Sequence, residues 1–155
     1  MTHPIETRLA EMGLTLPSAP APAANYVPFV QSGSTLYVSG QISMNADGGL
    51  ITGKVGADLD AEAGAAAAAR CALSLLAQAN AAVAGDWNKI NRVVKLTGFV
   101  NSTPDFADQP KIINGCSDLL VAVMGDAGRH ARSAVSAGAL PLNVAVEIEG
   151  IFELA

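Results

Sequence analysis

The sequence predicts an α+β fold, a two-layer sandwich in which two helices pack on one face of a mixed sheet. Two observations carry this prediction. Runs rich in β-branched residues alternate with two longer segments of helical periodicity, in the order strand, strand, helix, strand, helix, strand, strand. The last strand also alternates between apolar and acidic residues, as a sheet with one covered face requires.

Composition indicates one compact domain, which we place at residues 21–155 after an N-terminal lead-in over residues 1–20. The chain has 155 residues, of which 50% are hydrophobic and 15% charged. A formal net charge of −5 without any run of Lys or Arg disfavours a nucleic-acid-binding surface. No apolar stretch reaches the ~18 residues of a membrane span. No secretory signal is visible at the N-terminus, so we expect a cytoplasmic protein.

Prolines recur through the first part of the chain up to Pro28, which excludes a long helix or a central strand there. Residues 5–12 are expected to form a short helix that ends at Gly13. Two β-rich runs follow and should pair as a hairpin through residues 32–34; they are residues 29–31 and 35–39.

The middle of the chain supplies both helices of the predicted sandwich. An alanine-rich segment from about residue 58 to Gly85 is the stronger of the two, and its small side chains suit close packing against a sheet. The second helix should begin at residue 107 or 111 and continue to residue 123. The remaining β-rich runs are predicted strands at residues 90–101, 132–137 and 144–154.

The last predicted strand has one apolar and one acidic face. Val144, Val146, Ile148 and Phe152 share the apolar face, whereas Glu147, Glu149 and Glu153 share the other. Because both helices cover the same side of the sheet, the second side needs another cover. We therefore expect a homo-oligomer, although these residues do not specify how many copies it contains.

Neither a metal nor a cofactor is expected. Cys71 and Cys116 have no Cys-x-x-Cys spacing and are predicted to be small buried hydrophobic residues. His3 and His130 are the only histidines, and neither belongs to a cluster with metal-ligand spacing. Nucleotide-binding and nucleophile-elbow motifs are absent from the sequence.

Arg132 and Glu147 are the first candidates for chemistry. If the last two strands pair in antiparallel fashion with a turn near residues 139–140, Arg132 lies opposite Glu147. An arginine there can bind a carboxylate through two hydrogen bonds. A simple cross-strand ion pair on the surface explains the same spacing, so both interpretations stay open. His130 reads as an ordinary polar residue at the entrance to a strand.

Several separated motifs, in order, resemble the reactive intermediate deaminase (Rid) family, the YjgF-like group also called endoribonuclease L-PSP. The resemblance covers nearly the whole chain from about residue 21. Residues 1–20 and an insertion near residues 109–110 are similar to a longer subgroup. The motifs are Ala21-Pro22-Ala23-Ala24, Pro28-Phe29-Val30-Gln31, Ser39-Gly40-Gln41, Asp105-Phe106, Asn114, Arg132-Ser133, Leu140-Pro141 and Glu147-Ile148-Glu149.

The resemblance implies a chorismate-mutase-like fold, a homotrimer with clefts between subunits, and cofactor-free hydrolysis of reactive imines and enamines. Substrates of the 2-aminoacrylate type give a 2-oxo acid and ammonia, as in a 2-iminobutanoate/2-iminopropanoate deaminase. Arg132 then corresponds to the residue that binds the substrate carboxylate, and Glu147 to the acid that positions or activates water. Ser39 and Gly40 correspond to the pocket edge, and Asn114 to a polar residue lining the cleft.

Three positions depart from the family pattern. Phe29 stands where the family usually has a tyrosine, so the missing hydroxyl at this substrate-binding position would have to come from Tyr26. Ala134 replaces a frequent cysteine, which removes thiol chemistry. His130 replaces a proline or alanine and is a further candidate for substrate binding as an extra donor in the cleft.

Two other functions remain open at this point. A non-catalytic, regulatory trimer that binds small carboxylates, including 2-oxo acids, would need only Arg132. An endoribonuclease or translation inhibitor is an activity attached to the family's name, but the acidic composition and the lack of paired histidines disfavour it. Chorismate mutase activity would rest on fold analogy alone.

Overall fold

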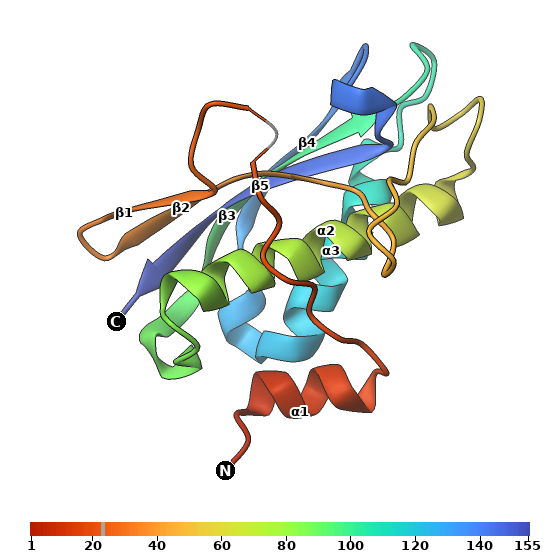
Figure 1. Cartoon of the computed structure of the whole chain (residues 1–155). Helices are drawn as coiled ribbons and strands as arrows, with labels where there is room; N and C mark the ends of the chain where they lie inside the picture. Colours follow the sequence, from red (N-terminus) through yellow and green to blue (C-terminus); the bar gives the residue numbers. More distant parts are fainter. Residues whose placement is uncertain (23) are drawn as a thin grey trace.

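Five strands form a single open sheet in the order β1-β2-β5-β3-β4 (Figure 1). The structure is a computed structural model and describes residues 1–22 and 24–155; Ala23, in the first motif of the family resemblance, lies outside the described residues. The strands are β1 (Phe29–Ser32), β2 (Thr35–Ile42), β3 (Ile90–Asn101), β4 (Ala131–Ala137) and β5 (Val146–Leu154).

Two helices, α2 (Ala61–Ala82) and α3 (Gln109–Met124), cover one face of this sheet, and a shorter helix α1 (Pro4–Glu11) packs against α3 (Figure 1). The α+β sandwich with two helices on one face of a mixed sheet is therefore confirmed. The helix at the N-terminus, the hairpin, both long helices and the strand at residues 90–101 also lie where the sequence predicts them. None of the described helices is long and apolar enough to cross a membrane.

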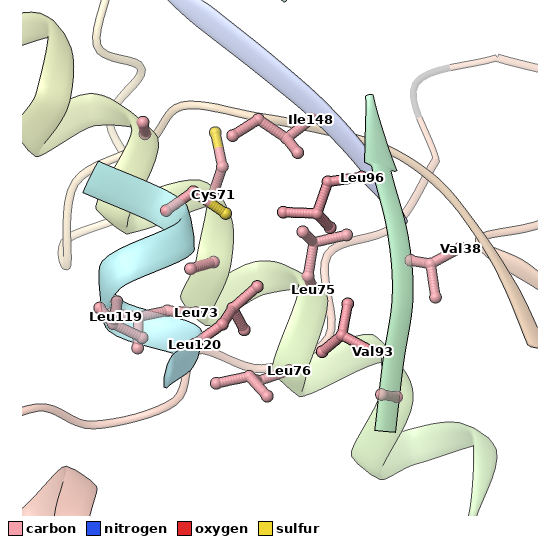
Figure 2. Packing of buried hydrophobic residues seen from close by; sticks show 14 of the residues in the cluster. Val38, Cys71, Leu73, Leu75, Leu76, Val93, Leu96, Leu119, Leu120 and Ile148 are labelled. Atoms are coloured by element: carbon pink, nitrogen blue, oxygen red, sulfur yellow. The ribbon is translucent and has the colours of Figure 1, made fainter. Parts of the chain in front are cut away.

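The core lies between the two long helices and the sheet. Figure 2 shows Leu75 and Leu76 of α2 together with Leu120 of α3 and Leu96 of β3, all fully buried. Each such leucine stabilises the fold by roughly 1.5–3 kcal/mol through burial of apolar surface. Cys71 is also buried, as is Cys116, and burial raises the pKa of both thiols, so the predicted structural role of the cysteines is confirmed.

Helix α2 begins at Asp60, whose side chain accepts a hydrogen bond from the Ala63 amide at 2.8 Å. The two long helices approach closely where Gly115 of α3 meets Ala65 of α2, because a side chain at Gly115 would collide with the Ala65 carbonyl. The alanines therefore serve helix-to-helix contact as well as the predicted contact with the sheet. This packing fixes α3 above β3 and β4, where the candidate Arg132 lies.

The predicted pairing of the last two strands is wrong. β4 pairs in parallel with β3, and β5 lies between β2 and β3 as an antiparallel strand. The helix between β3 and β4 makes a crossover that returns the chain parallel to β3. The connection from β4 to β5 is no tight hairpin; it contains the short 3-10 turn Pro141–Asn143, which carries the chain across the end of β3. Arg132 and Glu147 are consequently not cross-strand partners.

The sheet face turned away from the helices carries several exposed apolar side chains. Val30 and Tyr37 are direct partners on β1 and β2 and are 52% and 49% exposed, and Val135 of β4 is 43% exposed. Glu149 and Glu153 belong to this face and are exposed, as the alternation of β5 predicts. The covering of this face by other copies of the chain remains a prediction.

Candidate functional site

A cavity of about 750 Å³ opens on the face of the sheet opposite the helices. Its floor is formed by the ends of β2 and β5, and its walls by residues 20–22 and 24–28 and by the connection that precedes β5. The described lining residues are Pro20, Ala21, Pro22, Ala24, Tyr26, Pro28, Ser39, Gly40, Gln41, Ile42, Met44, Pro141, Leu142, Glu147 and Glu149.

Glu147 lies on the floor of this cavity. A register shift in β2 between Val38 and Gln41 places Gly40 directly beside it, and a Cβ atom at Gly40 would overlap the carboxylate. Burial raises the pKa of Glu147, and the neighbouring Glu149 raises it further. Among the described residues, no hydrogen bond or ion pair engages this carboxylate. It is therefore available to exchange a proton with a ligand in the cavity.

Of the other residues predicted for substrate binding, Ser39, Gly40 and Tyr26 line the same cavity. The Ser39 hydroxyl donates to the Val27 carbonyl at 2.8 Å, so it holds the N-terminal segment against β2. Phe29 does not line the cavity. It is paired with the buried Val38 and packs against the core, because alternation along β1 turns its side chain toward the helices.

One wall of the cavity has an unusual backbone. Leu142 and Asn143 have φ angles of 57° and 58°, in the left-handed region that non-glycine residues rarely adopt. The buried Asn101 holds this connection by donating from its Nδ2 atom to the Val144 carbonyl at 3.1 Å and to Asn143 Oδ1 at 3.3 Å. Residues held in such conformations concentrate at functional sites. No signal in the sequence identified Leu142 as a lining residue.

Arg132 lies on the other face of the sheet. It pairs with Leu96, whose side chain is fully buried beneath the helices, and its guanidinium contacts α3. Nη1 donates to Ser117 Oγ and Nη2 to the Pro110 carbonyl, both at 3.0 Å. Glu147 follows the buried Val146 along β5 and therefore points away from the helices. The two residues predicted to act together do not meet within one chain.

His130 belongs to the Arg132 side and does not line the cavity. Its Nδ1 atom is 2.6 Å from the Gly128 carbonyl, which only accepts, so the proton is on Nδ1. The Nε2 atom, 2.9 Å from Ser117 Oγ, then accepts from the hydroxyl. Burial lowers the pKa of His130 and Arg132 lowers it further, which favours this neutral form.

Ser117 therefore hydrogen-bonds to both Arg132 and His130, and the direction of each hydrogen bond is fixed. Its hydroxyl proton points to His130, which leaves its lone pairs for the Arg132 guanidinium. Asn114 is exposed on the same face of α3, one turn before Ser117 and one turn after Pro110. It thus lies beside Arg132 rather than in the Glu147 cavity. Sequence reasoning missed Ser117, because a lone serine inside a predicted helix carries no signal.

The chain is thus an α+β protein with two groups of candidate residues on opposite faces of its sheet. Glu147, Gly40, Ser39 and Tyr26 surround the cavity, which we call the carboxyl half-site. The second group, which we call the arginine half-site, consists of Arg132, Ser117, His130 and Asn114.

Comparison with known proteins identifies the family. The profile described as "YjgF/chorismate_mutase-like, putative endoribonuclease" matches residues 6–154. The chain is 33% identical to the 2-iminobutanoate/2-iminopropanoate deaminase of Escherichia coli K12 over 134 residues, 86% of this chain and 91% of that protein. The protein belongs to the YjgF/Rid family, as its sequence motifs predict.

Two more similar proteins carry names that state no reaction. Protein TCP17 of Trypanosoma cruzi is 48% identical over 97% of this chain and 94% of its own length. The crystal structure of Atu1372 from Agrobacterium tumefaciens, a protein of unknown function, superimposes with a TM-score of 0.92 at 51% identity, over 98% of this chain and 93% of that chain. At most four residues of this chain lie outside the TCP17 match, so most of the N-terminal lead-in is shared with that protein.

Proposed function

We propose that this protein hydrolyses imines and enamines that carry a carboxylate, releasing a 2-oxo acid and ammonia. The observation that supports it is the split of the candidate residues into two half-sites on opposite faces of the sheet. One chain cannot bring Glu147 and Arg132 together, whereas two copies packed side by side can. The proposal therefore includes a homo-oligomer, which the family resemblance suggests is a trimer, with each active site in a cleft between copies.

The arginine half-site suits the carboxylate of the substrate. The Arg132 guanidinium has more N–H donors than its contacts to Ser117 and Pro110 use, and its planar fork matches a carboxylate. Those two contacts hold the fork before a ligand arrives, which lowers the entropic cost of binding. We assign Asn114 as a further polar contact at the rim, and Ser117 and His130 as positioning residues.

The carboxyl half-site suits proton transfer. Water adds to the carbon of the C=N bond, and the resulting carbinolamine loses ammonia as the C–N bond breaks and the carbonyl forms. Glu147 takes a proton from the attacking water and returns one to the departing nitrogen. A carboxyl group whose pKa is raised by burial is better matched to both steps near neutral pH than an exposed one. The reaction is redox-neutral and uses only water as co-reactant.

The direct test generates an amino-acid imine in situ and follows 2-oxo acid release with the wild type, Arg132→Ala and Glu147→Gln. Acceleration by the wild type that either substitution abolishes supports the proposal. Failure of the wild type to accelerate, together with Arg132-dependent binding of 2-oxo acids, would favour a non-catalytic carboxylate-binding protein instead. Ribonuclease activity has no support in the cavity, which contains two glutamates and no basic residue among its described lining.

A further inference from the structure

The cavity beside Glu147 is far larger than the smallest imines need. Its volume of about 750 Å³ falls within the range of roughly 300–1,000 Å³ that is typical of sites for drug-sized ligands. A three-carbon imine bound at Glu147 would fill only a small part of this volume, which is that of a single chain. In the oligomer proposed above, the neighbouring copy that supplies Arg132 closes part of the space, and the remainder accommodates solvent or a larger substituent on the imine carbon.

The lining of this excess space is apolar. Its walls consist largely of proline, alanine, isoleucine, methionine and leucine side chains; the larger ones are Pro20, Pro22, Ile42, Met44, Pro141 and Leu142. Among the polar residues, the Ser39 hydroxyl is already used by Val27, and Gln41 Nε2 donates to the Ser39 carbonyl at 2.9 Å. Such walls favour an uncharged apolar substituent by the hydrophobic effect.

The charged residues of the cavity lining restrict the class of substrate further. Glu147 and Glu149 are the two charged residues of the described lining, and no lysine or arginine accompanies them. A second carboxylate on the substrate would be desolvated beside like charges, which is unfavourable. Imines derived from acidic amino acids should therefore be excluded, although the first carboxylate is bound by Arg132 outside this lining.

The N-terminal wall is held in place by a chain of hydrogen bonds through Gln78 of α2. Gln78 is 1% exposed, and its Nε2 atom donates to the Pro20 carbonyl at 2.6 Å and to Gln41 Oε1 at 3.3 Å. Ser39 fixes Val27 at the other end of the same segment. The wall is thus tied to both α2 and β2, so its shape is set before a ligand binds.

We propose that this cavity selects imines of amino acids with large, uncharged apolar side chains, such as those of leucine and phenylalanine. Residues 20–22 and 24–28 form the selective wall, and Gln78 is the positioning residue that holds it. This inference rests on the proposed function and adds the substrate class to it.

The test compares imines made in situ by an amino acid oxidase from leucine, phenylalanine, alanine and glutamate. Release of each 2-oxo acid is measured against trapping of the imine by semicarbazide. We expect kcat/KM for the leucine and phenylalanine imines to exceed that for the alanine imine at least tenfold, with the glutamate imine last. Equal values, or a preference for the alanine or glutamate imine, would overturn the substrate class. Hydrolysis of none of them would instead overturn the proposed function.

Two variants test which residues of the cavity determine the substrate selectivity. Ala21→Trp fills the cavity and should lower kcat/KM for the leucine imine at least tenfold more than for the alanine imine. Ala10→Trp, at an exposed position of α1, is the matched control and should change neither. Equal losses on both imines in Ala21→Trp would refute the assignment of the wall.

Gln78→Met removes both hydrogen bonds at nearly constant side-chain length. It should reduce the leucine-to-alanine ratio of kcat/KM at least threefold, because the wall loses its attachment to α2. A merely structural role would lower the melting temperature without changing this ratio. An unchanged ratio would refute the role of Gln78, and the Ala21→Trp result decides the proposal if Gln78→Met does not fold.

Discussion

Ser117→Ala tests how the arginine half-site is organised. The substitution removes the acceptor of the Arg132 Nη1 hydrogen bond at 3.0 Å and the donor to His130 Nε2 at 2.9 Å. Hydrogen bonds to charged groups contribute roughly 1.5–3 kcal/mol. Because Arg132 is partly exposed, we take a value just below this range, about 1.4 kcal/mol, which corresponds to roughly a tenfold effect.

The loss should fall mainly on KM for the imine, since Arg132 is proposed to bind the substrate carboxylate, which is present throughout the reaction. The assay is steady-state 2-oxo acid release at neutral pH, accompanied by a titration with a 2-oxo acid to measure Kd. Ser117→Thr retains the hydroxyl and should recover most of the affinity. Asp118→Asn changes the next, exposed residue of α3 and serves as the control.

Values of KM and Kd for Ser117→Ala within twofold of the wild type would refute this reasoning. A tenfold loss in Ser117→Ala that Ser117→Thr fails to recover would also contradict it, because the hydroxyl would then not be the group that matters.

Further predictions concern the two half-sites. Gly40→Ala should abolish imine hydrolysis in a folded protein, because the added methyl group overlaps the Glu147 carboxylate. Gly138→Ala is the control and should remain active, because nothing lies within 4 Å of the added methyl group. Equal activity of the two variants would show that close packing at Gly40 does not matter for hydrolysis. Arg132→Lys should lower kcat/KM by about tenfold or more in the same assay, since an ammonium group cannot reproduce the planar fork. Glu147→Gln should lower kcat by roughly 10²–10⁴-fold, as removal of a general acid–base group does. The same variant should be more heat-stable than the wild type at pH 7 and not below pH 4. Because the pKa of Glu147 is raised in the folded state, the folded protein binds more protons than the unfolded one, and its stability falls as the pH rises above the ordinary carboxyl pKa. The amide of Gln does not ionise, so the variant avoids this loss of stability. A melting temperature difference that does not vary with pH would contradict this.

Local patterns in the sequence were sufficient for the elements of the fold. The strand at residues 90–101 has the predicted bounds, and Asp60 begins the alanine-rich helix close to where its periodicity starts. These features depend on residues that are neighbours in the chain. The alternation of β5 likewise placed Glu147 on the face opposite the core, because side-chain direction along a strand follows from its period of two.

Strand order could not be predicted in the same way. The antiparallel pairing of the last two strands required a tight turn near residues 139–140, but Asn101 and the left-handed backbone at Leu142 carry the chain past β3 instead. Those contacts join residues about 40 positions apart, so no local pattern reveals them. The same limit explains why Gln78 and Ser117 were missed: each acts through long-range hydrogen bonds.

In the proposed oligomer, Glu147 of one copy works with Arg132 of another. Co-expression of Arg132→Ala and Glu147→Gln chains with different affinity tags, followed by purification through both tags, gives mixed oligomers. In a closed ring of three, each mixed oligomer has one interface of its three that joins an intact Glu147 to an intact Arg132, or about one third of the interfaces. We expect roughly that fraction of wild-type imine hydrolysis from two inactive parents. Mixed oligomers as inactive as either parent would contradict it.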